Sequence, residues 1–172
     1  MFTRILRTAL ISLAFALGFA SAALAAPSLT SLGPIQHGDA SLTVHGSEGA
    51  VVTYTVDELE RFPTYRLTTV TPWRPEPATF EGVLLTDVLA ASELRDVPAI
   101  RAIAENDFSS DIPKEVWDSV PVLIATRVNG APISRRERGP ILFVVEDAVY
   151  HEVAIVEERH LVWMAARIEP LR

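Results

Sequence analysis

Apolar residues along the chain follow two patterns, one typical of short strands and the other typical of short helices. Leu42 and Val44 alternate with polar neighbours, and a glycine-containing turn at 46–49 leads to a second apolar stretch at 51–54. This arrangement predicts a β-hairpin. Further strand candidates, rich in apolar or β-branched residues, are 65–71, 100–104, 122–128, 141–145 and 163–168.

Helical patterns occur at three places. Residues 55–58 fit a capping box, in which the Thr55 hydroxyl accepts from the Glu58 N–H while the Glu58 carboxylate reaches back; the helix then ends before Pro63. Apolar residues at helical spacing predict a helix over 84–91. Pro113 suits the first turn of a third helix. Short strands mixed with short helices predict the α+β class, a compact domain in which helices pack on a mixed β-sheet.

Turns are predicted where glycine, proline and asparagine cluster. Pro72, Pro75 and Pro77 predict an irregular loop around Trp73. The sequence Asn-Asp-Phe at 106–108 predicts a turn. The Asn-Gly pair at 129–130 predicts a tight turn after the strand at 122–128.

The chain of 172 residues is long enough for one domain with a sizeable core. Residues 1–25 are typical of a secretory signal peptide, because Arg4 and Arg7 precede an apolar run and Ala-Leu-Ala at 23–25 offers a cleavage site. Residues 26–40 lack periodicity and are expected to form a flexible lead-in, so the domain is expected over 41–172. The apolar run is short for a membrane span. We therefore expect a periplasmic or secreted protein with no span after cleavage.

Charge narrows the range of partners. Cleavage after residue 25 removes two of the 15 basic residues and none of the 22 acidic ones, which leaves a net charge of −9. A surface of that charge repels nucleic acid and anionic lipid, so neither is an expected partner. The chain contains no cysteine, so no disulfide stabilises it.

Several short motifs occur in a characteristic order between Ser41 and Ile168. They are Phe-Glu-Gly-Val-Leu-Leu-Thr-Asp-Val-Leu at 80–89, Asn-Asp-Phe at 106–108 with Ile-Pro at 112–113, Asn-Gly-Ala-Pro-Ile at 129–133, Arg-Gly-Pro at 138–140, and Trp163 with Ile168. In order and approximate spacing this series resembles the sulfite-oxidase-type molybdopterin-binding domain. The resemblance implies a compact α+β fold, like that of the short secreted members of the family.

The resemblance also implies a metal ligand that this chain lacks. In catalytic members a cysteine thiolate binds molybdenum, and alignment on Trp73 places that position on or near Thr69. A protonated hydroxyl is a poor substitute, because soft metal centres prefer thiolate. The family's closing lysine is Val162 here, and its histidine before Gly-x-Pro is Arg138. A conventional sulfite-oxidising enzyme is therefore not expected, and molybdopterin is implied by the family alone.

Candidate binding residues lie in three segments. Arg135, Arg136 and Arg138 before Gly139 suggest an anion site, which the family comparison places near the pterin or phosphate end of the cofactor; the alternative is a solvated loop. Trp73 would stack on a planar ligand or anchor its loop in the core. Asn106 and Asp107 would bind a ligand or fix their own turn.

Other chemistry has less support. His151 and His160 are nine residues apart with three glutamates between them, but this spacing does not match one face of a helix and gives no compact set of metal ligands. There is no Gly-x-Ser-x-Gly motif for nucleophilic hydrolysis. We therefore assign no catalytic residue and no metal ligand.

Three functions follow from these observations. The first is a non-redox binding module, a periplasmic sensor or accessory protein that holds a small anionic or planar ligand or a protein partner. The second is a molybdopterin-dependent oxidoreductase with an oxygen ligand, for which Thr69 and Thr71 are the candidates. The third is an interaction domain that serves a membrane-bound electron-transfer or signalling complex.

Overall fold

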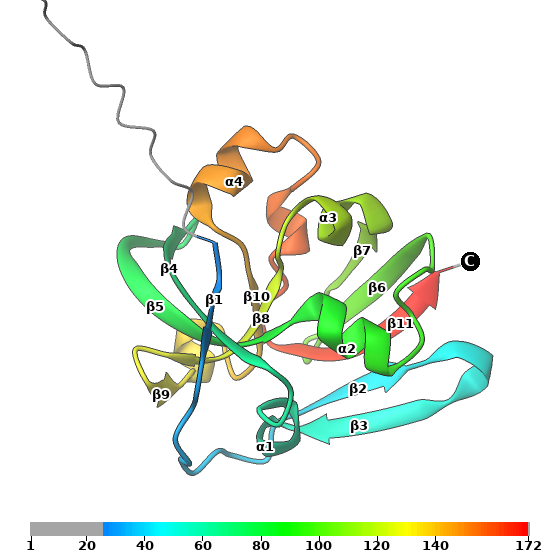
Figure 1. The fold of residues 1–172 in the computed structure, drawn as a ribbon, viewed down its shortest axis with the longest axis horizontal. Coiled ribbons are helices and arrows are strands. Elements are labelled where there is room, and N and C mark those ends of the chain that lie inside the picture. Colours follow the sequence, from blue (N-terminus) through cyan, green and yellow to red (C-terminus); the bar gives the residue numbers. More distant parts are fainter. Residues whose placement is uncertain (1–25, 172) are drawn as a thin grey trace, which may run out of the picture.

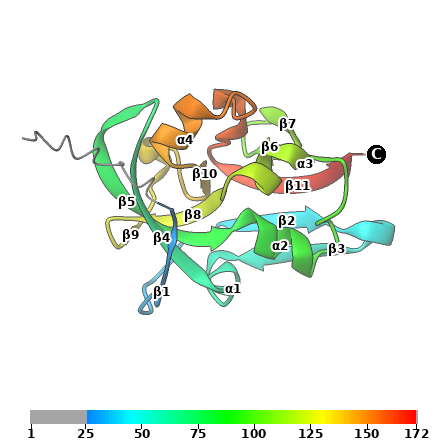
Figure 2. The ribbon, with the colours of Figure 1, turned by 45° about the horizontal axis from the view of Figure 1, so that its top comes forward.

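Two β-sheets lie side by side in the computed structural model, which describes residues 26–171 (Figures 1 and 2). One sheet has the strand order β1-β4-β5-β8-β10, with β9 paired to β8; the other has the order β3-β2-β11-β6-β7. Strands β2 and β11 pair in parallel, whereas the neighbouring pairs β2–β3 and β11–β6 are antiparallel. The predicted α+β class with a mixed sheet is confirmed.

The bounds of the elements are as follows. The strands are β1 (Ser28–Thr30), β2 (Ser41–His45), β3 (Val51–Thr55), β4 (Thr64–Thr71), β5 (Arg74–Leu84), β6 (Ala99–Ala104), β7 (Ser109–Pro113), β8 (Leu123–Val128), β9 (Ala131–Pro132), β10 (Leu142–Val144) and β11 (Ala165–Leu171). The helices are α1 (Val56–Leu59), α2 (Leu85–Ala91), α3 (Lys114–Ser119) and α4 (Asp147–Glu152), with 3-10 turns η1 (Ser47–Gly49), η2 (Arg135–Glu137) and η3 (Glu158–His160). None of the helices within the described residues is both long and apolar enough to cross a membrane.

Local sequence signals account for several of these elements. The predicted hairpin is present as β2 and β3, and the capping box is confirmed: the Glu58 N–H donates to the Thr55 hydroxyl over 3.2 Å, and the Thr55 N–H donates to the Glu58 carboxylate over 2.8 Å. The predicted turn at 129–130 is also confirmed. Asn129 and Gly130 both have positive φ, 51° and 78°, as a tight hairpin turn requires.

Strand β8 is central to the packing because it is buried on both faces. Ile124 belongs to the larger core, which the two sheets and their helices share, whereas Leu123 and Ala125 belong to a smaller core with Phe80 and Leu142. This double burial explains why the stretch is almost continuously apolar. It also places residues 126 and 127, which are polar, in the interior.

The expectation of an irregular loop around Trp73 is wrong. Only Pro72 and Trp73 separate β4 from β5, and Thr71 pairs with Arg74. The ladder with β4 is interrupted between Arg74 and Ala78, and the pairing of β5 with β8 begins only at Phe80. Pro75 and Pro77 therefore lie in a strand segment where no ladder N–H is needed, which is where a strand accepts proline.

Three regular elements carry no strong local signal. Strand β1 comes from the segment 26–40 that was expected to be a flexible lead-in; it pairs with β4 at the edge of the sheet. Strand β7 and helix α4 also lie in stretches without clear periodicity. Helix α4 begins with Glu146 as its N-cap, whose carboxylate accepts from the Val149 N–H over 2.9 Å. The proposed signal peptide lies outside the described residues.

Candidate functional site

A pocket of about 280 Å³ lies between the start of β5 and the loop that follows β9. Its polar rim carries Arg74, Arg136, Glu137 and Arg138 beside Trp73, and its apolar side is formed by Phe80, Val128, Ile133 and Leu142. We call it the arginine pocket. Three guanidinium groups face one carboxylate there, so its charge is positive in a chain of net charge −7. Such a pocket attracts anions.

Arg138 is the best-fixed cation of the arginine pocket. Its guanidinium carbon lies 5.0 Å from the ring centre of Trp73 and 4.6 Å from that of Trp163, so the cation contacts two indole rings. The backbone of Arg138 has a left-handed conformation with φ of 70°, which is strained for a residue other than glycine. Its carbonyl accepts a hydrogen bond from the Met164 N–H over 3.0 Å, which ties this loop to the chain before β11.

The next residue, Gly139, is required by the packing of the same loop. A Cβ atom at this position would lie 2.2 Å from the carbonyl oxygen of Ile133. The Gly139 N–H donates to the Ser134 carbonyl over 2.9 Å. Gly139 therefore shapes the pocket by letting two stretches of backbone approach closely.

The remaining predicted site residues do not join this pocket. Arg135 turns away from it and forms a bidentate ion pair with Glu105, with distances of 2.8 and 2.9 Å, which raises the pKa of Arg135. Asn106 and Asp107 are exposed, and the Asn106 side chain accepts from the Phe108 N–H over 3.3 Å. The structure thus brings Arg136, Arg138 and Trp73 together but not Arg135, Asn106 or Asp107.

Thr69 and Thr71 lie buried at the end of β4. The Thr69 hydroxyl accepts from the Asp147 N–H over 2.9 Å and donates to the Val70 carbonyl over 3.2 Å. It therefore holds the start of α4 against β4. The Thr71 hydroxyl is buried and has no hydrogen-bond partner among the described residues.

Comparison with known proteins identifies the fold. Residues 32–153, well over half of the chain, match the family described as oxidoreductase molybdopterin binding domain. The chain belongs to this family. Among solved structures, the sulfane dehydrogenase SoxCD from Paracoccus pantotrophus is similar, with a TM-score of 0.58 and 19% sequence identity over 80% of this chain and 40% of that chain. No curated protein matches this chain.

This oxidoreductase molybdopterin-binding domain does not fit a thiolate-held molybdenum centre. The chain has no cysteine, and Thr69, which the resemblance places at or near the ligand position, already uses its hydroxyl for two backbone groups. A hydroxyl engaged in this way has neither the charge nor the softness that molybdenum requires. The chain therefore keeps the domain's fold without the family's metal ligand.

The sequence does not identify Arg74, which lines the arginine pocket, or Trp163, whose ring contacts Arg138, as site residues. Arg74 follows the proline-rich stretch whose structure was predicted wrongly, and its side chain lies 3.6 Å from Glu137. In the sequence, Trp163 stands out only as part of a closing motif with Ile168. Strand pairing is what brings these two residues to the site: Thr71 pairs with Arg74, and Leu142 forms a bridge with Trp163.

The two histidines considered for a metal site lie in different surroundings. His151 is exposed on α4 and lies 3.4 Å from Asp147. His160 is buried in η3, where its Nδ1 accepts from the Glu157 N–H over 3.1 Å, and burial lowers its pKa. Within residues 26–171, no three histidine or acidic side chains are grouped so that they could hold a metal ion.

Proposed function

We propose that this oxidoreductase molybdopterin-binding domain is a non-redox binding module that acts outside the cytoplasm as a sensor or accessory protein. Its ligand is a small planar anion held in the arginine pocket. The observation that carries the proposal is the gathering of Arg74, Arg136 and Arg138 with Trp73 around one pocket of an acidic chain. Guanidinium groups bind carboxylate and phosphate oxygens in pairs, and an indole ring offers a flat surface for stacking.

The non-redox part of the proposal rests on Thr69. Its hydroxyl bonds to the Asp147 N–H and the Val70 carbonyl, and the chain offers no thiolate. The location rests on residues 1–25, which resemble a cleavable secretory signal. Intact mass measurement of the exported protein checks cleavage after residue 25.

The direct test is native mass spectrometry with metal analysis of the exported protein from its host. We expect no molybdenum and either a bound organic anion or an empty pocket. Stoichiometric molybdenum with a pterin would contradict the non-redox proposal.

A second experiment tests the pocket itself. Phenyl phosphate, a planar anion, is titrated while the fluorescence of the tryptophans is followed, with benzamide as a neutral planar control. We expect phenyl phosphate to change the fluorescence saturably, and Arg136→Ala to weaken its binding by about tenfold or more, which corresponds to about 1.4 kcal/mol. Arg61→Ala, an exposed arginine outside the pocket, is the matched control. Equal binding by both variants would remove the pocket from the proposal.

One observation keeps the oxygen-ligand oxidoreductase as a second candidate. The buried Thr71 hydroxyl has no hydrogen-bond partner within residues 26–171, so Thr71 is the remaining candidate ligand once Thr69 is engaged. Metal content of the Thr71→Ala variant decides this alternative. A metal that is bound by the unmodified protein and lost in the variant would favour it over the binding module.

A further inference from the structure

A second pocket, of about 260 Å³, adjoins the arginine pocket. Its lining is mostly apolar and its rim is charged; the residues are Trp73, Phe108, Leu161 and Trp163 in the lining and Glu158 and Arg159 at the rim. We call it the aromatic pocket. Trp73 lines both pockets, so the two meet at one indole ring.

Neither pocket alone reaches the size of a typical small-molecule site. Such sites measure about 300–1,000 Å³, whereas the arginine pocket measures about 280 Å³ and the aromatic pocket about 260 Å³. Taken together, the two pockets fall within that range. A ligand that used both would also find the usual composition of such sites, an apolar wall with a few polar groups.

The wall between the two pockets is the stack that Arg138 forms with two indole rings. Arg138 lines the arginine pocket and Trp163 lines the aromatic pocket, and the Arg138 guanidinium contacts the rings of Trp73 and Trp163. Both rings thus already face a cation. A second cation in the aromatic pocket would be repelled by this charge, so an uncharged group is the favoured occupant.

Hydrogen bonds through Met164 hold the loops of both pockets in one arrangement. The Met164 N–H donates to the Arg138 carbonyl over 3.0 Å, and the Met164 carbonyl accepts from the Glu105 N–H over 2.8 Å. Trp163, the preceding residue, is thereby fixed between the loop of Arg138 and the turn at 105–108. The two pockets are therefore parts of one preformed surface.

Phe108 is the exposed wall of the aromatic pocket. It is 42% exposed, and it is the only exposed ring among the phenylalanine, tyrosine and tryptophan residues of 26–171. Its turn is held by hydrogen bonds: the Asn106 side chain accepts from the Phe108 N–H over 3.3 Å, and the Phe108 carbonyl accepts from the Ala104 N–H over 2.8 Å. A ring held in this way beside a pocket offers apolar surface to a ligand.

The charges at the two rims decide which end of a ligand each pocket takes. Arg159 forms an ion pair with Glu157 over 2.8 Å, which leaves the carboxylate of Glu158 at the rim of the aromatic pocket. The arginine pocket carries three guanidinium groups and one carboxylate. An anionic group is therefore attracted to the arginine pocket and repelled from the aromatic pocket.

A β-bulge in β8 helps to fix the apolar side of the arginine pocket. Glu81 pairs with Arg127, whereas the next residue, Gly82, pairs with Ala125, so Thr126 is the extra residue of β8. A bulge re-aims side chains that would otherwise point to opposite faces of the sheet. Here it directs both Thr126 and Arg127 to one buried carboxylate.

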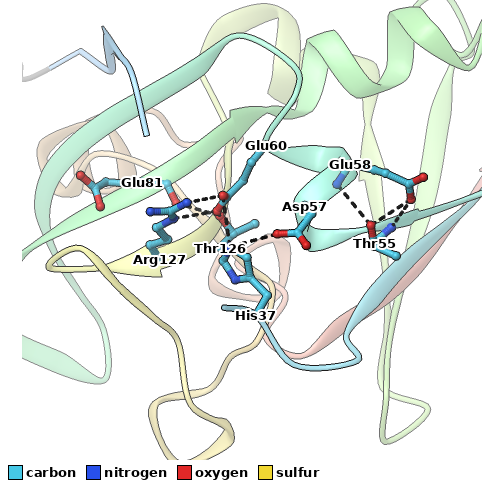
Figure 3. Close-up of polar contacts among 8 residues, drawn as sticks. All are labelled: His37, Thr55, Asp57, Glu58, Glu60, Glu81, Thr126 and Arg127. Carbon is cyan, nitrogen blue, oxygen red and sulfur yellow. Dashed lines mark hydrogen bonds and ion pairs between the residues drawn. The ribbon is translucent and has the colours of Figure 1, made fainter. Parts of the chain in front are cut away.

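That carboxylate belongs to Glu60, which follows α1 and has a side chain that is only 8% exposed. It accepts from the Thr126 hydroxyl over 2.7 Å and from the Arg127 Nε over 2.9 Å (Figure 3). The Thr126 carbonyl in turn accepts from the Ile133 N–H over 3.4 Å, and Ile133 lines the arginine pocket. The buried cluster therefore fixes this side of the pocket before a ligand arrives.

We propose that the natural ligand is an amphipathic organic anion that occupies both pockets. Its charged group, a phosphate or a carboxylate, lies in the arginine pocket, and its uncharged aromatic extension reaches past Trp73 into the aromatic pocket. This inference rests on the proposed function and narrows its planar anion to one with two parts. Phe108 is the residue that selects for the extension.

Isothermal titration calorimetry of the exported protein tests the second part of the ligand. Phenyl phosphate fills the arginine pocket alone, whereas biphenyl-4-yl phosphate carries a second ring for the aromatic pocket. We expect the biphenyl compound to bind about tenfold more tightly or better, with a more negative heat capacity change, because its outer ring buries apolar surface. Equal affinities of the two compounds would overturn the inference.

Phe108→Ala removes the exposed wall of the aromatic pocket. It should reduce the advantage of the biphenyl compound to about threefold or less and leave the affinity for phenyl phosphate unchanged. Phe108→Leu keeps an apolar side chain and should retain part of the advantage. Val51→Ala, which shortens an exposed apolar side chain on β3, is the matched control and should retain all of it. An advantage that survives in Phe108→Ala would place the second ring elsewhere and refute the inference.

Arg136→Ala separates this inference from the proposed function on which it rests. Arg136 lines the arginine pocket but not the aromatic pocket, so its loss should weaken the binding of both phosphates by the same factor. If Arg136→Ala changes neither affinity, the arginine pocket does not bind the anion, and the proposed function fails together with the inference. If Arg136→Ala weakens both compounds but the unmodified protein binds them equally, only the inference fails.

Discussion

Thr69 links two elements through a single hydroxyl. It accepts from the Asp147 N–H of α4 and donates to the Val70 carbonyl, and the residue is only 5% exposed. A buried N–H that loses its acceptor keeps its full desolvation cost. Thr69 is therefore a structural residue at or near the position where the family resemblance leads one to expect a metal ligand.

Thr69→Val should lower the free energy of unfolding by about 1–3 kcal/mol, because the Asp147 N–H loses its buried acceptor. Urea unfolding at constant pH measures the change. Thr69→Ser keeps the hydroxyl and should therefore lower the free energy of unfolding by less than Thr69→Val does. If valine and serine cost the same, the hydrogen bond to α4 is not what Thr69 provides.

Arg138 should contribute to stability through its two indole contacts. Arg138→Ala removes both and should cost about 1–2 kcal/mol, since each exposed or partly exposed cation–π contact is worth about 0.5–1 kcal/mol. Tryptophan fluorescence should change in the same variant, because Trp73 and Trp163 lose their shared cation. Arg136→Ala, which removes a cation without such contacts, should stay within about 0.5 kcal/mol of the unmodified protein.

The sequence indicates which residue types are close along the chain but not where they point. Arg135, Arg136 and Arg138 are neighbours, yet the 3-10 turn η2 separates successive side chains by about 120°. The left-handed backbone of Arg138 then directs its guanidinium to the two tryptophans. For this reason an anion site of three adjacent arginines is not formed, and Arg74 from β5 completes the pocket instead.

Short elements with strong local signals were the predictable part of the fold. The capping box of α1 and the turn at 129–130 depend on interactions within four residues, so the local sequence is enough to predict them. Strand β1 depends on pairing with β4, more than 30 residues away, and has no signal of its own. The same holds for the bulge of β8, which places Thr126 and Arg127 on Glu60.

Gly82 is required where β5 and β8 approach each other at this bulge. A Cβ atom there would lie 2.0 Å from the carbonyl oxygen of Ile124, which is backbone and cannot move aside cheaply. Gly82→Ala should therefore cost about 3 kcal/mol in unfolding free energy. Gly33→Ala has open space around its added methyl group and should be nearly neutral. Thermal or urea unfolding of the two variants compares them, and a mild effect at position 82 would contradict the close approach.

The turn η3 should make stability depend on pH through His160. Burial lowers the pKa of His160, so the folded state disfavours the proton that the unfolded chain accepts. A group whose pKa is depressed on folding contributes stability above its unfolded pKa, about 6.5 for histidine, and that contribution is lost as pH falls. The free energy of unfolding of the unmodified protein relative to His160→Asn should therefore decrease from about pH 7.5 to pH 5. A constant difference between the two proteins would show that His160 does not titrate in this way.

The class and mixed sheet of the whole chain followed from alternating short strands and helices, but the division into two sheets did not. Sheet order depends on pairings such as β2 with β11, in which Thr43 meets Arg167. Sequence periodicity reports which face of a strand is buried and says nothing about its neighbour. The family resemblance implied a compact α+β fold but likewise gave no strand order, so the two sheets are known from the structure alone.

Strand β11 lies in the middle of its sheet, between β2 and β6, although it is the last strand of the chain. Residues 165–171 are therefore what joins the β2–β3 and β6–β7 hairpins into one sheet. Removal of this strand would leave each hairpin with an unpaired edge, and exposed edges invite pairing with other chains, so aggregation rather than a smaller folded domain is the expected result of that truncation.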